Sequence, residues 1–185
     1  NSLDGICWPL KVIHSRDKFY LKENRKEQPK EYFKFILQQS KQYIETLQTS
    51  SPKILDVGCA TGEFLYYFKS VYPEIQSTGL DIMPELLENA KRENPNSDFI
   101  CGDISKKDTL PKSKFDIVYM LGVHSIFDDY EPVFDNFIDL IKNDGGRGYI
   151  FNFFNPEDLD VLVKVRESGD TGSWQAVYCN IISKT

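Results

Sequence analysis

Short apolar segments alternate with longer amphipathic segments through most of the chain. The apolar runs cover residues 54–57, 75–80, 98–101, 115–121 and 148–154. Three segments between them are long enough for helices: residues 63–71, 84–93 and 130–142. Strands that alternate with helices indicate a parallel sheet with right-handed crossovers, and several runs lack the strict polar–apolar alternation of a one-sided sheet. The pattern therefore predicts an α/β, Rossmann-like fold, a mostly parallel sheet flanked by helices.

The chain before the first apolar run has a different pattern. From about residue 17 to residue 47 it is rich in Lys, Glu and Gln, with an apolar stripe formed by Tyr32, Phe33, Phe35, Ile36, Leu37, Tyr43, Ile44 and Leu47. This spacing predicts an amphipathic helix that covers one face of a core, with Pro29 in its first turn. We therefore expect a helical extension or lid over residues 1–50 and a core over residues 51–185.

Composition and charge narrow the range of functions. Lys plus Arg number 22 against 28 Asp plus Glu, and the formal net charge of −6 does not favour nucleic-acid binding, which gains from counterion release by cations. No apolar run approaches the roughly 20 residues that span a bilayer, and no signal peptide opens the chain. The cysteines are far apart and predict free structural thiols: Cys7, Cys59, Cys101 and Cys179. We expect a cytoplasmic protein that binds a small molecule, with no metal, nucleic acid or membrane partner; the oligomeric state stays open.

The most informative segment joins the first predicted strand to the first helix of the core. It reads ILDVGCATGEF, so that Asp56 leads into a turn with Gly58, Ala60 and Gly62. Glycine allows a positive φ and lets a ligand approach the backbone. In a parallel α/β sheet such a turn lies at the carboxyl end of the strand, where ligands bind. The turn predicts a binding site, with a plain strand-to-helix connection as the alternative.

An acidic residue at the end of the second predicted strand supports the binding interpretation. Asp81 follows Gly62 by 19 positions, and a carboxylate there accepts both hydroxyl hydrogens of a ribose. A nicotinamide-binding domain shares this acid but has the glycine pattern G-x-G-x-x-G. Here Asp56 leads the turn, where it would repel a pyrophosphate but support the ammonium group of an amino acid. The carboxylate next to the turn therefore favours S-adenosylmethionine (SAM) over a nicotinamide dinucleotide.

These motifs resemble those of the class I SAM-dependent methyltransferases. ILDVGCATG is similar to the first motif of the family, and its later motifs are matched in order by GLDIM, FICGDIS, FDIVYMLGVHSIFDD and LIKNDGGRGYIF. The resemblance covers roughly residues 53–154. Ala60 replaces a glycine that is frequent in the first motif, and Asn143-Asp144 replace lysine-proline variants before the fifth strand. The resemblance implies the class I methyltransferase fold, SAM as the cofactor, and methyl transfer to a small molecule.

The resemblance also implies roles for individual residues. The turn would hold the methionine part of SAM, and Asp81 would bind its ribose. The other implied cofactor contacts lie at the ends of strands: Ile82 beside the adenine, Asp103 on the adenine amino group, Ile104 through its backbone amide, and Leu121 where the fourth strand faces both cofactor and substrate.

Two segments outside the core resemble a narrower group, the methyltransferases of bacterial surface-polysaccharide and nucleotide-sugar pathways. FYLKENRKEQP precedes the core, and FFNPEDLDVLVK, followed by Trp174, comes after the fifth predicted strand. In that resemblance the first segment is a lid, which would place Tyr20 near the methionine end of SAM. The expected acceptor is then a sugar or nucleotide-sugar hydroxyl, and the expected pathway is polysaccharide biosynthesis. The alternative is that Phe19, Tyr20 and Leu21 only anchor a helix to the core.

Methyl transfer from SAM depends mainly on positioning, because the sulfonium already makes the methyl group electrophilic. A hydroxyl acceptor also needs its proton removed, and histidine is suited to this near neutral pH. The chain has two histidines. His14 is expected on the surface before the core, whereas His124 follows the fourth predicted strand, with Asp128 on the same loop. We predict His124 and Asp128 as catalytic residues; the alternatives are a hydrogen-bonded histidine and a carboxylate that caps the next helix.

The last part of the chain is short for this fold. The family's sheet usually has seven strands, and after residue 154 the sequence offers one strand candidate, residues 175–182. We therefore expect an incomplete C-terminal hairpin in a truncated chain. Two other functions fit the same turn. One is a noncatalytic SAM-binding or scaffold protein, which would leave no reactive group near the sulfonium, and the other is a nicotinamide-dependent dehydrogenase.

Overall fold

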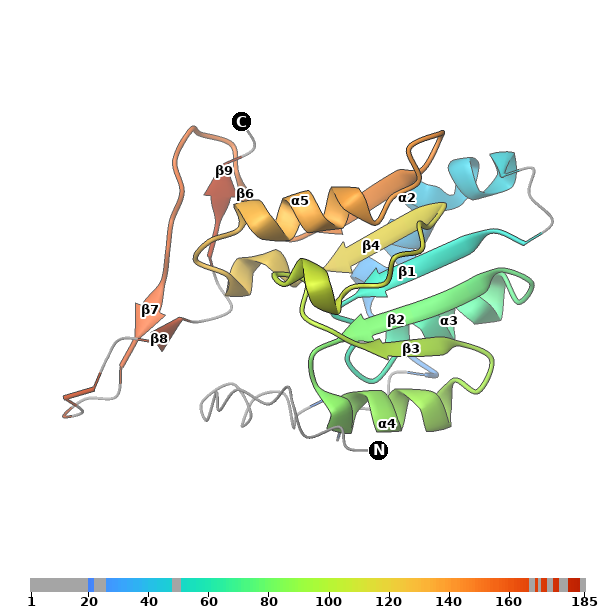
Figure 1. The fold of residues 1–185 in the computed structure, drawn as a ribbon, viewed down its shortest axis with the longest axis horizontal. Coiled ribbons are helices and arrows are strands. Elements are labelled where there is room, and N and C mark those ends of the chain that lie inside the picture. The colour runs from blue at the N-terminus through green and yellow to red at the C-terminus, as the bar shows by residue number, and fades with distance from the viewer. Residues whose placement is uncertain are drawn as a thin grey trace.

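The computed structural model describes residues 20–21, 26–47, 51–166, 169, 171–172, 175–176 and 180–183. Its centre is a five-stranded sheet in the order β3-β2-β1-β4-β5 (Figure 1). The strands are β1 Lys53–Val57, β2 Gln76–Asp81, β3 Asp98–Cys101, β4 Ile117–Leu121 and β5 Arg147–Phe151. All neighbouring strands are parallel. The chain order reverses between β1 and β4, and open α/β sheets bind ligands at such a switch point.

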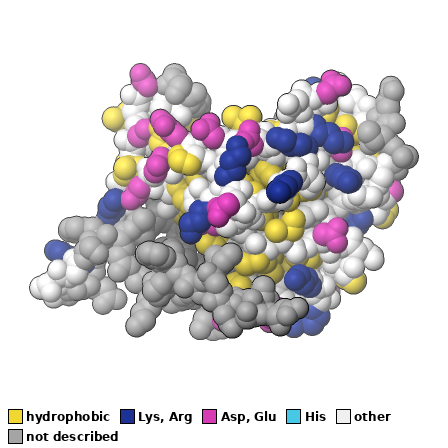
Figure 2. Space-filling model, in the orientation of Figure 1, with side chains coloured by type: hydrophobic (Ala, Val, Ile, Leu, Met, Phe, Trp, Pro, Cys, Tyr) yellow, Lys and Arg dark blue, Asp and Glu magenta, His cyan; other side chains and the backbone are white. Residues whose placement is uncertain are grey.

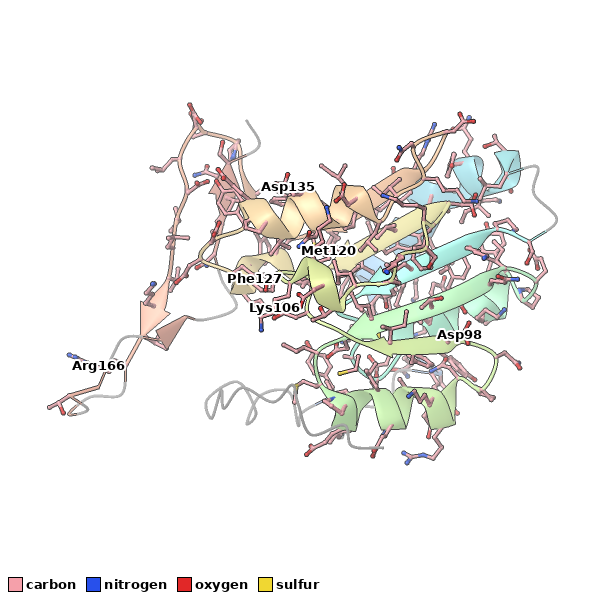
Figure 3. All side chains as sticks on the ribbon, in the orientation of Figure 1. Asp98, Lys106, Met120, Phe127, Asp135 and Arg166 are labelled. Carbon is pink, nitrogen blue, oxygen red and sulfur yellow. The ribbon has the colours of Figure 1, made fainter. Side chains whose placement is uncertain are left out.

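Helices cover both faces of the sheet. They are α2 Glu31–Thr46, α3 Glu63–Val71, α4 Pro84–Glu93 and α5 Glu131–Asp139. One core joins α2 and α3 to β1 and β4 through Phe33, Phe64 and Tyr119. A second core joins α5 to the opposite sides of the same strands, with Phe137 against Met120, which Figure 3 labels on β4. Burial on both faces explains why the strands read as continuous apolar runs.

The predicted α/β fold is confirmed, and the main difference within the sheet concerns the fifth strand. The chain leaves the sheet at Phe151, and Phe154–Asn155 form a separate short strand, β6. The predicted run 148–154 is therefore two elements. The Asn152 side chain accepts the backbone N–H of Phe153 at 2.8 Å, and such a local hydrogen bond competes with the ladder of a strand.

The predicted amphipathic helix is confirmed but begins later than expected. Lys30 is the N-cap of α2 with an extended ψ of 142°, so the helix starts at Glu31 and Pro29 lies outside its first turn. Most of the predicted apolar stripe faces the core, where Phe33 and Ile44 are buried, but Phe35 is 51% exposed and lies outside it. Because α2 packs into the same core as β1, the division at residue 50 stays a prediction. Residues 1–19 and 22–25, which include His14 and Phe19, lie outside the described residues.

After β5 the described residues form two small pairings. β6 runs parallel to β9 (Ile182–Ser183), and β7 (Lys164–Val165) runs antiparallel to β8 (Gln175–Ala176). The single strand predicted over residues 175–182 is therefore wrong, because its two ends pair with different partners. Figure 1 shows β7 and β8 away from the sheet, and Figure 3 labels Arg166 beyond β7. Trp174 and Cys179 lie outside the described residues.

Candidate cofactor and active site

The turn after β1 needs glycine for two reasons. Gly58 and Gly62 have φ angles of 73° and 76°, and Ala60, at 47°, is the one non-glycine residue with positive φ in the described part of the chain. A Cβ on Gly58 would lie 2.3 Å from Cγ2 of Val123. The turn therefore combines a left-handed backbone with close packing against the segment that follows β4.

A small cavity of about 50 Å³ adjoins this turn. Its lining brings together five of the residues predicted to contact a cofactor: Tyr20, Asp56, Gly58, Ala60 and Leu121. These residues come from the segment before α2, from the end of β1 with its turn, and from the end of β4. The sequence analysis missed the rest of the lining: Lys30, Tyr32, Phe33, Cys59, Thr61, Glu63 and Phe64.

Asp56 is the most unusual group in this cavity. Its side chain is 3% exposed, and none of the described residues donates a hydrogen bond to its carboxylate. Burial, and secondly the negative charge of Asp81, raise the pKa of Asp56 well above its ordinary value. A buried carboxylate without a donor is costly. A cation bound in the cavity would remove that cost by pairing with it.

A second charged group in the lining links the start of α2 to the start of α3. The ammonium of Lys30 lies 3.4 Å from the Glu63 carboxylate, and the side chains are 19% and 12% exposed. The same ammonium lies 5.1 Å from the centre of the Tyr20 ring. The cavity is thus lined by two carboxylates and one ammonium, and Lys30 attaches Tyr20 to its edge.

Asp81, at the end of β2, is hydrogen-bonded to the turn. Its carboxylate accepts the backbone N–H of Ala60 and that of Met83, each at 2.9 Å. The residue is 9% exposed. Each carboxylate oxygen can accept a second hydrogen bond, so ribose binding by Asp81 stays a prediction beside this structural role.

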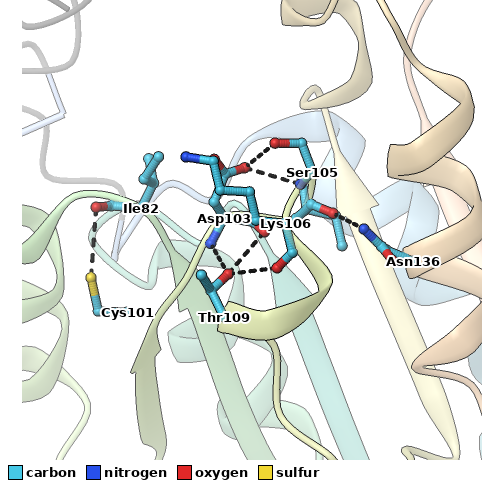
Figure 4. A network of polar contacts seen from close by, with 8 residues as sticks. Ile82, Cys101, Asp103, Ser105, Lys106, Thr109 and Asn136 are labelled. Atoms are coloured by element: carbon cyan, nitrogen blue, oxygen red, sulfur yellow. Dashed lines mark hydrogen bonds and ion pairs between the residues drawn. The ribbon is translucent and has the colours of Figure 1, made fainter. Parts of the chain in front are cut away.

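The end of β3 carries the third predicted strand-end acid in a local polar network (Figure 4). The Asp103 carboxylate accepts the backbone N–H and the hydroxyl of Ser105 at 3.0 and 2.7 Å, and it lies 3.2 Å from the Lys106 ammonium. The carbonyl of Ile104, whose side chain is buried, accepts a hydrogen bond from Asn136 at 2.8 Å. This network fixes the chain just after β3.

The remaining predicted cofactor contacts are not among the residues that line the 50 Å³ cavity. Ile82 is 48% exposed after β2, and Gly62 lines a second cavity of about 260 Å³ that α3 and α4 border. The structure therefore groups the residues predicted for the methionine part of a cofactor. Those predicted for its adenine, Ile82, Asp103 and Ile104, follow β2 and β3 at the same edge of the sheet, and their roles stay predictions.

His124 is buried, not open to the cavity. It begins the short 3-10 turn η2, His124–Ile126, and is 0% exposed. Its ring stacks on Phe154 with centroids 4.8 Å apart and lies 5.5 Å from the Phe134 ring. Neither ring nitrogen has a hydrogen-bond partner among the described residues. Figure 2 shows no histidine on the face that it draws.

Asp128 also lies apart from the cavity lining. Its carboxylate is 2.7 Å from the Lys164 ammonium and 3.4 Å from the side-chain nitrogen of Asn180. The hydrogen bond from Lys164 lowers the pKa of Asp128. The alternative capping role is wrong, because α5 begins after Tyr130 without a side-chain cap. The catalytic roles of His124 and Asp128 stay predictions, and in this conformation neither residue reaches the cavity.

We expect the His124 imidazole to titrate far below the usual value of about 6.5. Burial lowers its pKa to about 4. Since the unfolded chain takes up this proton near pH 6.5 and the folded chain only near pH 4, this group lowers stability as the pH falls between these values. NMR of the imidazole C–H signals measures the titration, with His14→Gln to assign them. A His124 signal that titrates near pH 6.5 would contradict the buried position.

The described residues contain no cluster of three or more His, Cys, Asp or Glu that could hold a metal ion. Cys59 and Cys101 are free thiols, as predicted. No helix in the described part of the chain has the length and apolar composition needed to cross a membrane.

Comparison with known proteins matches residues 54–145 to a family described as a methyltransferase domain. The chain is 30% identical over 95 residues to a malonyl-[acyl-carrier protein] O-methyltransferase of Ilyobacter polytropus. This alignment covers 50% of this chain and 35% of that protein. It is 25% identical over 118 residues to a trans-aconitate 2-methyltransferase of Escherichia coli, and that alignment covers 62% of this chain and 46% of that protein. The chain thus spans less than half the length of these curated relatives.

Solved structures show the same fold. A plantazolicin methyltransferase, BpumL, in complex with S-adenosylhomocysteine (SAH) aligns with a TM-score of 0.57 at 20% identity, over 76% of this chain and 53% of that one. A TehB-like SAM-dependent methyltransferase from Corynebacterium glutamicum aligns with a TM-score of 0.57 at 22% identity, over 76% and 73%. The family match contains the glycine turn and four of the five parallel strands of the sheet. Residues 54–145 of this chain therefore match the methyltransferase-domain family, and the chain has the class I methyltransferase fold.

Proposed function

We propose that this chain binds SAM at the turn after β1 and transfers its methyl group to a small-molecule acceptor. The observation that carries the proposal is the buried Asp56 carboxylate, which lines the cavity and has no hydrogen-bond donor among the described residues. The ammonium of the methionine part of SAM is a cation that supplies both a charge and hydrogen bonds. Pairing with it would favour the ionised form of Asp56.

The charges around the cavity support this proposal. The lining contains the carboxylates of Asp56 and Glu63 and the ammonium of Lys30. SAM carries a sulfonium, an ammonium and one carboxylate, so the two sets of charges are complementary in sign and number. A nicotinamide dinucleotide carries a pyrophosphate, which the two carboxylates would repel. This comparison favours SAM over the dehydrogenase cofactor.

Bound SAM supplies an electrophilic methyl group, because its sulfonium is a good leaving group. The chain would hold and enclose it. Asp56 would orient the methionine end, while Gly58 and Ala60 let it approach the backbone. Tyr20, held by Lys30 at the edge of the cavity, would exclude water from that end.

The other end of SAM would lie along β2 and β3. Asp81 would bind the ribose while it holds the turn. Ile82, Asp103 and Ile104 would contact the adenine. Leu121, at the end of β4, would lie between cofactor and acceptor.

The finer proposal is that the acceptor is a sugar or nucleotide-sugar hydroxyl in polysaccharide biosynthesis. It rests on the likeness of the segments that flank the core. A hydroxyl needs a base, and we retain His124, with Asp128, for that role. His124 can serve only if Phe154 moves off its ring, since the imidazole is 0% exposed in this conformation.

The second candidate is a SAM-binding protein without methyltransferase activity. The burial of His124 away from the cavity favours it, because no described histidine then faces the methyl group. The two candidates agree on SAM binding and differ in turnover. A direct assay of methyl transfer separates them.

The test has two stages. Calorimetric titration with SAM, SAH and NAD should show binding of the first two and not of NAD. The protein is then incubated with methyl-labelled SAM and a panel of acceptors. The panel includes sugars and nucleotide sugars, and also malonyl and aconitate compounds, because two relatives are named for such acceptors. A gain of one methyl group on an acceptor supports the enzyme, binding without any gain supports the second candidate, and preference for NAD refutes both.

We expect Asp81→Asn to weaken SAM binding at least about tenfold and also to lower the melting temperature. The amide keeps one acceptor oxygen, so the N–H of Ala60 or that of Met83 loses its charge-assisted bond, which contributes about 1.5–3 kcal/mol. Calorimetry with SAM and thermal melting followed by circular dichroism measure the two effects. Asp98→Asn, at an exposed position in β3, is the matched control and should change neither. If SAM affinity is unchanged in Asp81→Asn, the ribose assignment is wrong.

A further inference from the structure

The loop that carries His124 is held by a residue close to the C-terminal end of the sequence. Asn180 is 1% exposed, and its backbone N–H donates to the carbonyl of Ser125 at 3.1 Å. Its side-chain nitrogen donates to the carbonyl of Phe127 at 3.0 Å and to the Asp128 carboxylate at 3.4 Å. One residue therefore contacts the loop 124–128 at three places.

The same residue joins this loop to the segment that leads into β7. The side-chain oxygen of Asn180 accepts the backbone N–H of Val163 at 2.9 Å. Beside it, Ile181 and Val161 exchange two backbone hydrogen bonds of 2.8 and 2.9 Å. Asparagine suits this position because its side chain both donates and accepts, whereas an ionised aspartate cannot donate.

The described backbone hydrogen bonds inside the loop are local: the N–H groups of Ile126 and Phe127 donate to the carbonyls of Val123 and His124. The loop contains η2, a single 3-10 turn, and such turns are weak on their own. Its first residue, His124, makes ring contacts but no hydrogen bond through either ring nitrogen. Figure 3 labels Phe127, on the part of the loop that leads towards α5. The position of the imidazole therefore depends on bonds made elsewhere in the loop.

We propose that Asn180 is a positioning residue for the acceptor end of the site: it sets the conformation of the loop 124–128 and thereby the position and solvation of His124. The inference rests on the proposed function, in which this loop borders the acceptor. It assigns to the segment after β5 the role of holding one wall of the site.

The electrostatic surroundings of His124 make its protonation a clean measure of this role. The elements packed on its ring present Phe134 from α5 and Phe154 from β6. The nearest charges of the network, Asp128 on the same loop and Lys164 on β7, pair with each other at 2.7 Å. Burial alone lowers the pKa of His124, so entry of water is what would raise it.

The test compares Asn180→Ala and Asn180→Leu with the parent by NMR of the imidazole signals, in the His14→Gln background. Release of the loop should raise the pKa of His124 from about 4 by at least one unit. Asn180→Leu is close to asparagine in size and loses the side-chain donor and acceptor without adding a charge, so it should show the same rise and decides the question if Asn180→Ala does not fold. The Kd for SAM should stay within twofold of the parent's.

Asn94→Ala is the matched control. Asn94 is 6% exposed and donates one side-chain hydrogen bond to the carbonyl of Ala90 at 3.1 Å, at the end of α4. Its loss should lower the melting temperature without moving the pKa of His124. A pKa that stays near 4 in the Asn180 variants, or that rises equally in Asn94→Ala, would overturn the positioning role. Failure of the parent to bind SAM would instead refute the proposed function, which the NMR titration does not test.

Discussion

Asp56→Asn should weaken SAM binding by about 10²–10⁴-fold and leave the fold intact. The carboxylate is 3% exposed and lines the cavity, so the ammonium of SAM would lose a charged partner in a place that water reaches poorly. Removal of one partner from a buried ion pair costs about 3–5 kcal/mol, and each 1.36 kcal/mol is a factor of about ten. Calorimetric titration at neutral pH measures the loss.

The same substitution should raise the melting temperature of the SAM-free protein at neutral pH. The pKa of Asp56 is raised by burial, and a carboxyl group whose folded pKa lies above its unfolded value stabilises the fold at low pH. That stability is lost as the pH rises through the folded pKa, and an amide avoids the loss. In the parent, SAM affinity should rise with pH over the same range, because SAM binds the ionised form.

Asp116→Asn is the matched control for this substitution. Asp116 is also buried, at 4% exposed, but it accepts the backbone N–H of Lys53 at 2.8 Å and the Lys142 ammonium at 2.7 Å. Asp116→Asn should lower the melting temperature and leave SAM affinity unchanged. Asp56→Asn should instead raise the melting temperature and weaken SAM binding. If Asp56→Asn binds SAM within threefold of the parent, Asp56 does not hold the ammonium.

Local signals explain how much of the fold the sequence predicts. α3, α4 and β3 have the predicted bounds, because a left-handed glycine precedes α3 and a proline starts α4. The end of β5 was not predictable in this way. It depends on one side-chain bond at Asn152, and asparagine occurs in strands and in turns. The start of α2 was similarly misplaced, since Pro29 fits both within and just before a helix.

The residues of the candidate site also differ in whether a local sequence pattern predicts them. The turn from Asp56 to Gly62 is continuous in sequence, so its predicted residues were found together, and of these Asp56, Gly58 and Ala60 line one cavity. The Lys30–Glu63 pair joins two helices and has no local signature. The burial of His124 depends on Phe154 and on the loop that Asn180 holds, both from the last part of the chain. The local sequence around His124 does not indicate whether distant residues bury its side chain, so this burial could not be predicted.

His124→Phe should lower turnover of a hydroxyl acceptor by about 10²–10⁴-fold, the usual contribution of a positioned acid–base group. It should also raise the melting temperature by several degrees. Phenylalanine keeps a flat ring beside Phe134 and Phe154, and it removes two ring nitrogens that have no hydrogen-bond partner among the described residues, which cost about 1–3 kcal/mol each when buried. SAM affinity should not change, because His124 does not line the cavity. Steady-state rates, thermal melting and calorimetry measure the three effects.

The combination of results decides the role of His124. Higher stability with lost turnover means that the chain retains an unfavourable buried imidazole for catalysis, and that Phe154 uncovers it during the reaction. Higher stability with more than half the turnover removes His124 from the mechanism. The acceptor would then need no base, as for a group that is already ionised at neutral pH, such as a carboxylate. Since a carboxylate attacks the methyl group without losing a proton, its rate should be flat from pH 6 to 8, and positioning at the end of β4 would be the whole of catalysis.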